Sequence, residues 1–88
     1  MSTKASEAAP LAPALAMAIR QRREELGMTH QKLATAAGFQ RTFVTDVERG
    51  ARSISVGTLV RLARALRLMP STLLTRAEKL AAEMTDSA

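Results

Sequence analysis

The sequence has no cysteine, no tryptophan and no tyrosine among its 88 residues. Without cysteine the chain can form neither a disulfide framework nor a thiolate metal site, so it needs no oxidising compartment and a cytoplasmic location is expected. Its aromatic residues are two phenylalanines, Phe39 and Phe43. Sheets favour β-branched and aromatic side chains, whereas this chain is 47% hydrophobic and rich in alanine and leucine, which indicates an all-α domain.

The chain also has little of what membranes, catalysis and metal binding require. No stretch approaches the ~20 apolar residues of a membrane span, and residues 1–10 lack the apolar core of a signal peptide. There is one histidine, His30, and there is neither a glycine-rich phosphate loop nor a pair of carboxylates placed in a convincing cleft. The sequence therefore disfavours an enzyme and predicts no catalytic residue, no metal site, no cofactor and no small-molecule ligand.

Basic residues, in contrast, are plentiful and are concentrated in the middle of the chain. The formal net charge is +5 and the isoelectric point is about 11.1. Between Arg20 and Arg67 ten basic residues stand against four acidic ones, and arginine outnumbers lysine ten to three overall. A planar guanidinium suits forked contacts to phosphates and guanine edges. This distribution fits nucleic-acid binding and, equally, an ordinary solvated surface.

Hydrophobic periodicity and capping residues predict five short helices around one core. They are expected from Leu11 or Pro13 to Leu26, His30 to Ala37, Arg41 to Arg49, Val56 to Leu68 and Thr72 to Met84. Thr29, Ser55 and Ser71 are the expected N-caps of the second, fourth and fifth helices. The expected organisation is a flexible tail over residues 1–10, a single domain over residues 11–84, and a frayed end over residues 85–88.

The second and third predicted helices are about two turns long each and are joined by a very short link that pivots on Gly38. Two short helices with a glycine between them have the geometry of a helix-turn-helix. The sequence therefore predicts a helix-turn-helix from about Thr29 to Arg49.

Landmarks on both sides of this motif resemble the Cro/CI-like, or XRE, family of helix-turn-helix transcriptional regulators. They are Leu26-Gly27, Leu33-Ala34, Gly38, Val44, Glu48-Arg49-Gly50 and Leu62-Ala63-x-x-Leu66. Within that family, the run Arg41-Thr42-Phe43-Val44 with the segment Glu48 to Ser55 is similar to the controller proteins of restriction–modification systems. Those are small dimers that regulate their own operon and the endonuclease gene. The resemblance implies a five-helix phage-repressor-like fold and sequence-specific binding to a two-fold-related DNA operator.

The resemblance implies base contacts from the start of the third helix and one turn later. The matching residues are Gln40, Arg41, Thr42, Thr45 and Asp46. Arg41 is the leading candidate because arginine to guanine is the commonest specific contact, although a phosphate contact is the alternative. Asp46 accepts from a cytosine amino group, repels phosphates and so excludes some DNA sites, or is a surface acid paired with Arg49 or Lys32.

Phosphate contacts are implied at the start of the second helix and in the loop after the third. The matching residues are His30, Gln31, Arg49, Arg52 and Ser53. The family commonly has glutamine where this chain has His30, so His30 either donates to a phosphate or is an idle surface residue. Arg23 and Glu48 match a family pair that forms an internal ion bridge, and they are assigned to structure.

Apolar residues near the C-terminus exceed what so small a domain can bury alone. A homodimer is therefore expected through Leu68, Met69, Leu73, Leu74 and Ala77, with an intramolecular cap on the core as the alternative. Arg61, Arg64 and Arg67 are expected on the fourth helix, either near DNA or solvating its outer face. A second interpretation of the whole chain is an antitoxin that uses the same fold to bind a toxin.

Overall fold

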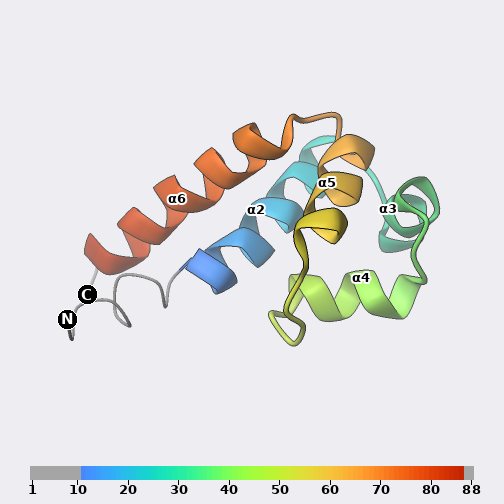
Figure 1. Cartoon of the computed structure of the whole chain (residues 1–88), viewed down its shortest axis with the longest axis horizontal. Helices are drawn as coiled ribbons and strands as arrows, with labels where there is room; N and C mark the ends of the chain where they lie inside the picture. The colour runs from blue at the N-terminus through green and yellow to red at the C-terminus, as the bar shows by residue number, and fades with distance from the viewer. Residues whose placement is uncertain (1–10, 87–88) are drawn as a thin grey trace.

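A computed structural model describes residues 11–86 of the chain, so the tail predicted over residues 1–10 lies outside the described residues. The described part contains five helices and no strand, which confirms the all-α expectation. They are α2 (Leu11–Glu25), α3 (His30–Ala37), α4 (Arg41–Glu48), α5 (Val56–Ala65) and α6 (Pro70–Asp86). Figure 1 shows α2 and α6 lying side by side in opposite directions, with α3 and α4 at the other end of the molecule.

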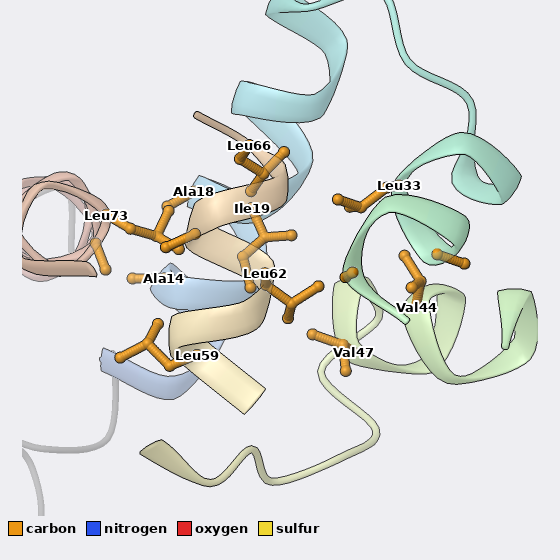
Figure 2. Close-up of a cluster of buried hydrophobic side chains, with 14 residues drawn as sticks. Ala14, Ala18, Ile19, Leu33, Val44, Val47, Leu59, Leu62, Leu66 and Leu73 are labelled. Carbon is orange, nitrogen blue, oxygen red and sulfur yellow. The ribbon is translucent and has the colours of Figure 1, made fainter. Parts of the chain in front are cut away.

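The core lies between the five helices, and α5 packs against α3 and α6. Its largest fully buried side chains are those of Ile19, Leu33, Val44, Leu62, Leu66 and Leu73. Figure 2 shows Leu62 of α5 and Leu66, directly after α5, in the middle of this cluster, with Val44 and Val47 reaching it from α4. Ala14 and Ala18 of α2 and Ala77 of α6 are also fully buried. These small side chains let α2 and α6 pack closely against each other.

Two predicted N-caps are confirmed. The Thr29 hydroxyl accepts a hydrogen bond from the Lys32 amide at 3.0 Å, and the Ser55 hydroxyl accepts one from the Thr58 amide at 3.1 Å. Each bond satisfies a backbone donor that the first turn of a helix leaves without a partner. The starts of α3 and α5 are therefore fixed by local chemistry that the sequence displays directly.

The end of α5 differs from the prediction. The helix ends at Ala65 and not at Leu68, because Arg67 adopts a left-handed backbone with a φ of 60°. The Leu68 amide then donates to the Ala63 carbonyl at 2.9 Å, and the Arg67 amide donates to that of Arg64 at 3.0 Å. These two hydrogen bonds together form a Schellman motif, in which glycine is the usual left-handed residue. The turn buries part of Leu68 against the core, which a local reading of the sequence does not reveal.

The bounds of α6 also differ from the prediction. The helix begins at Pro70 and not at Thr72, so Ser71 lies inside the first turn and is not the N-cap. Proline is tolerated there because the first-turn amides have no partner within the helix. At the other end α6 continues through Asp86, and residues 87–88 lie outside the described residues. None of the described helices combines the length and the apolar character that a membrane crossing requires.

Two residues of the predicted dimer surface belong to the core instead. Leu73 and Ala77 are both 0% exposed, because the face of α6 that carries them packs against α2 and α5. Leu68 and Leu74 remain partly exposed, and Met69 is 67% exposed. The intramolecular cap that the sequence left open as the alternative is therefore correct for Leu73 and Ala77.

Candidate nucleic-acid interface

The turn between α3 and α4 gives the two helices their relative orientation. Gly38 has a φ of 78°, a left-handed backbone that glycine adopts at no steric cost. The Phe39 amide donates to the Ala34 carbonyl at 2.8 Å, which closes the end of α3 before the chain enters α4. Thus α3, the turn and α4 form the helix-turn-helix that the sequence predicts (Figure 1).

The first turn of α4 presents side chains to solvent. Gln40, Arg41 and Thr42 are all exposed, and the Gln40 side chain makes no cap bond to the helix. Within residues 11–86, the Arg41 side chain has neither a hydrogen bond nor an ion pair. Its guanidinium is therefore available to a partner outside the chain.

One turn later, Thr45 and Asp46 face away from the buried side of α4 and are half-buried. The Thr45 hydroxyl donates to the Thr42 carbonyl at 2.9 Å, which turns its oxygen toward the helix. The Asp46 carboxylate lies 3.9 Å from the Arg52 guanidinium. The ionic neighbour of Asp46 is thus Arg52, and not Arg49 or Lys32 as the sequence suggested, because the loop after α4 folds back along the helix.

At the end of α4 lies a nearly buried carboxylate that anchors the helix to α2. Arg23 donates to both Glu48 carboxylate oxygens, at 2.7 and 3.0 Å, and to the Met28 carbonyl at 2.8 Å. The Glu48 side chain is 4% exposed and that of Arg23 is 10% exposed. The hydrogen bonds to Glu48 raise the pKa of Arg23, and the pair that the sequence predicts is present.

The two residues predicted to hold a phosphate at the start of α3 face partners within the chain. His30 Nε2 lies 3.0 Å from the Glu48 carboxylate, so His30 joins the anchor of α4. The Gln31 side-chain amide donates to the Thr35 hydroxyl at 3.1 Å on the same helix. Within residues 11–86 no group of three or more histidine, aspartate or glutamate side chains could hold a metal ion.

The loop after α4 supplies the other predicted phosphate contacts. Arg49, Arg52 and Ser53 are all exposed. Arg52 is the most constrained of the three, because its guanidinium lies 5.1 Å from the ring centre of Phe43 and close to Asp46. These contacts place the Arg52 guanidinium beside α4.

Sequence reasoning missed the contribution of Arg61. Its Nε donates to the Ala37 carbonyl at 3.0 Å, and its Nη2 donates to the Gly38 carbonyl at 2.7 Å. Arg61 was expected to lie near DNA or to solvate the outer face of its helix, but it binds the turn of the motif. The contact joins residues more than twenty positions apart, so no local pattern signals it. Only the helical spacing, which puts Arg61 on one side of α5, hints that it faces α3.

Further contacts of charged side chains hold α2 to its neighbours. Arg22 Nε donates to the Leu66 carbonyl at 3.0 Å, at the end of α5. Arg76 of α6 binds both Glu25 carboxylate oxygens, at 3.0 and 3.1 Å. The hydrogen bond from Arg76, followed by the one from Arg22, lowers the pKa of Glu25. These contacts join α2 to the end of α5 and to α6, and none of them involves the exposed face of α4.

Known proteins match both the motif and the surrounding fold. The helix-turn-helix family matches residues 19–73, which include the whole of α3, the turn and α4. Control protein C.SmaI of Serratia marcescens is 37% identical over 62 residues, which span 70% of this chain and 74% of that protein. Control protein C.BamHI of Bacillus amyloliquefaciens is 35% identical over 57 residues, which span 64% of this chain and 70% of that protein.

Two crystal structures extend the match to three dimensions. The clp gene regulator ClgR of Corynebacterium glutamicum has a TM-score of 0.84 at 27% identity, over 88% of this chain and 82% of its own. The restriction–modification controller protein C.AhdI of Aeromonas hydrophila has a TM-score of 0.69 at 34% identity, over 74% of this chain and 97% of its own. All four relatives are thus named as control proteins or gene regulators.

Proposed function

Because the chain belongs to the Cro/CI-like helix-turn-helix family and is a DNA-binding transcriptional regulator, we propose that it is the controller protein of a restriction–modification system. The protein acts by binding an operator and not by catalysis. A DNA-binding regulator works where the DNA lies, so the proposal includes a cytoplasmic location. The four relatives described above favour this function over the antitoxin alternative.

One observation carries the proposal: α4 is fixed on one side and free on the other. Val44 and Val47 bind it to the core, and Glu48 anchors its last residue to α2. Arg41 in its first turn is exposed and has no partner within residues 11–86. A helix held in this way can enter the major groove with its side chains already placed, which lowers the entropic cost of binding.

We assign the base contacts to Gln40, Arg41, Thr42, Thr45 and Asp46. The phosphate contacts are assigned to Arg49, Arg52 and Ser53 of the loop, and to Gln31 and His30 at the start of α3. His30 would use Nδ1, since its Nε2 faces Glu48. The hydrogen bond between Gln31 and Thr35 would open for Gln31 to reach a phosphate.

We further propose that residues 11–84 form the DNA-binding domain and that α6 and the turn before it join two copies. A single motif reads few base pairs, and a two-fold dimer presents two recognition helices about one duplex turn, roughly 34 Å, apart. Met69 is 67% exposed, and the partly exposed Leu68 and Leu74 are near it in sequence. With Leu73 and Ala77 committed to the core, these three residues remain as the proposed dimer surface.

Protection mapping of the DNA upstream of the chain's own gene tests the proposed function. We expect two related half-sites about 34 Å apart along the duplex, protected at physiological salt more strongly than random-sequence DNA of the same composition. Equal protection of both DNAs would show that binding is not sequence-specific and would contradict the proposal. Genes for a methyltransferase and a nuclease next to this gene would support the controller, whereas a toxin gene would support the antitoxin.

A further inference from the structure

Arg61 closes the end of α3 with two hydrogen bonds. The carbonyls of Ala37 and Gly38 belong to the last turn of α3 and to the residue after it, where a helix leaves acceptors without partners. The Arg61 fork fills both, at 3.0 and 2.7 Å. A cation is also favourable at this negative end of the helix dipole. Arg61 thus ties α5 to the point at which the chain turns from α3 into α4.

The same guanidinium begins a stack that contains both phenylalanines of the chain. Its Cζ lies 4.0 Å from the ring centre of Phe39. The ring centres of Phe39 and Phe43 are 4.7 Å apart, and the two ring planes are tilted by 34°. Arg52 lies over Phe43, with its Cζ 5.1 Å from the ring centre. All three contacts are within the favourable ranges for cation–π and aromatic pairs.

This Arg61–Phe39–Phe43–Arg52 stack connects four parts of the DNA-binding unit. Arg61 comes from α5, Phe39 from the turn, Phe43 from α4 and Arg52 from the loop after α4. The apolar contacts of Val44 and Val47 are not directional, whereas a guanidinium fork and a ring stack fix angles as well as distances. The stack therefore constrains how α4 is rotated and tilted relative to α5.

We propose that Arg61 is a positioning residue for α4: through this stack it sets the affinity for a specific DNA sequence without contacting DNA. The inference rests on the proposed function, in which α4 reads bases. Gly38 is part of the arrangement, since a Cβ there would lie 2.6 Å from Arg61 Nη2. Gly38 therefore has two roles in the turn: it adopts the left-handed backbone, and it leaves room for the Arg61 guanidinium.

A substitution that conserves the positive charge tests the proposal. Arg61→Lys keeps the positive charge but loses the fork and the flat stacking surface. The matched control is Arg64→Lys, because Arg64 is also exposed on α5 and its side chain has no ion pair or hydrogen bond within residues 11–86. The probes are a duplex that the unmodified protein selects from a random-sequence library and, for comparison, mixed-sequence genomic DNA.

Arg61→Lys should weaken binding to the selected duplex at least about tenfold, because hydrogen bonds from a charged group are lost at the turn. Binding to mixed-sequence DNA and its salt dependence should stay unchanged, and Arg64→Lys should change neither affinity. Retained affinity for the selected duplex overturns the proposal. So does an equal loss for both DNAs, which would make Arg61 a phosphate contact.

A second pair of variants displaces Arg61 without removing it. Gly38→Ala and Gly27→Ala both replace a glycine of positive φ, but an added Cβ at Gly27 meets nothing within 4 Å. Both variants place a Cβ on a left-handed backbone, with a φ of 68° at Gly27 and 78° at Gly38, and only Gly38→Ala crowds the guanidinium. Gly38→Ala should therefore lose more affinity for the selected duplex than Gly27→Ala. Equal losses overturn the proposal.

A measurement without DNA separates failure of this inference from failure of the proposed function. Hydrogen exchange of the Phe39 amide, which is bonded to the Ala34 carbonyl, reports on the closed turn. Exchange should be faster in Arg61→Lys and unchanged in Arg64→Lys. Unchanged exchange in both variants overturns the stack as a positioning device. If the unmodified protein selects no sequence from the library, the proposed function fails, and the exchange result still decides whether Arg61 fixes the turn.

Discussion

At the scale of single residues, Arg41 and Glu48 have opposite surroundings on the same short helix. Arg41 is exposed and has no ionic or hydrogen-bonding partner within residues 11–86, whereas the Glu48 side chain is 4% exposed and binds two side chains of the same chain. Exposure of a cation at a helix start favours a role in binding, and burial of a paired carboxylate favours a role in stability.

Replacement of Arg41 should affect recognition and not folding. We expect Arg41→Ala to lose about 1–3 kcal/mol of binding free energy at its cognate base pair and to relax specificity there. Thermal unfolding should be unchanged, because the side chain has no partner in the described part of the chain. Titrations against operators that differ at one position measure the effect. A uniform loss across all operators would instead assign Arg41 to a phosphate.

Replacement of Glu48 should affect folding first. Glu48→Ala leaves the guanidinium of Arg23 buried without its carboxylate, which should cost about 3–5 kcal/mol of the free energy of unfolding. The control is Glu24→Ala, because Glu24 pairs with Arg20 at the surface, with side chains 55% and 63% exposed, and its carboxylate lies 4.0 Å from Arg23, too far for a hydrogen bond. That loss should be below about 1 kcal/mol. Urea unfolding measures both, and similar values for the two variants would show that burial of the Arg23–Glu48 pair contributes little.

At the scale of the elements, the helices end with similar backbone geometry but different residues. Gly38 is left-handed directly after α3, and Arg67 is left-handed two residues after α5. A side chain in this conformation is strained, because Cβ approaches the following carbonyl. The end of α5 is therefore held by its tertiary surroundings, including the partly buried Leu68 and the hydrogen bond from Arg22 to the Leu66 carbonyl.

Glycine at position 67 should relieve this strain. We expect Arg67→Gly to raise the free energy of unfolding by about 0.5–1 kcal/mol, the relief of strain less the added chain entropy of glycine. Arg64→Gly is the matched control, since it places glycine inside α5 and should destabilise by about 1 kcal/mol. Urea unfolding compares the two variants. A loss of stability in Arg67→Gly would mean that the arginine side chain stabilises the turn by more than its backbone costs.

At the scale of the whole molecule, the dimer is a proposal that exposure of apolar residues motivates. Met69→Glu should raise the dissociation constant of the dimer at least about tenfold, because an apolar contact is lost and two like charges meet across the two-fold axis. Folding of the single chain should be retained, since a carboxylate is favourable next to the start of α6.

Val56→Glu provides the control for the dimer. Val56 is 77% exposed, lies at the start of α5, and is outside the proposed dimer surface. Sedimentation equilibrium over a range of protein concentrations measures the association of both variants. Equal dissociation constants for Met69→Glu and the unmodified protein would contradict the proposed surface.

The sequence by itself determined the elements that local chemistry specifies. Thr29 and Ser55 cap their helices as predicted, because a hydroxyl before a helix bonds an amide three residues on. The helix-turn-helix around Gly38 follows from a glycine between two short amphipathic segments. The Arg23–Glu48 pair came from resemblance to a family and not from spacing, since its two members are distant in the chain.

Only the tertiary structure decided the features that depend on which surfaces meet. Leu73 and Ala77 match an interface as well as a core, and packing against α2 placed them in the core. The end of α5 at Ala65 depends on the partial burial of Leu68 against the core. The hydrophobic pattern of the sequence does not show whether the helix ends there or continues to Leu68. Arg61 has the residue type of a DNA contact, but in the fold its guanidinium binds the carbonyls of Ala37 and Gly38. Hydrogen bonds between segments that are distant in the chain form only where the fold brings those segments together. Which segments meet depends on the packing of the whole core, and no local stretch of the sequence determines it.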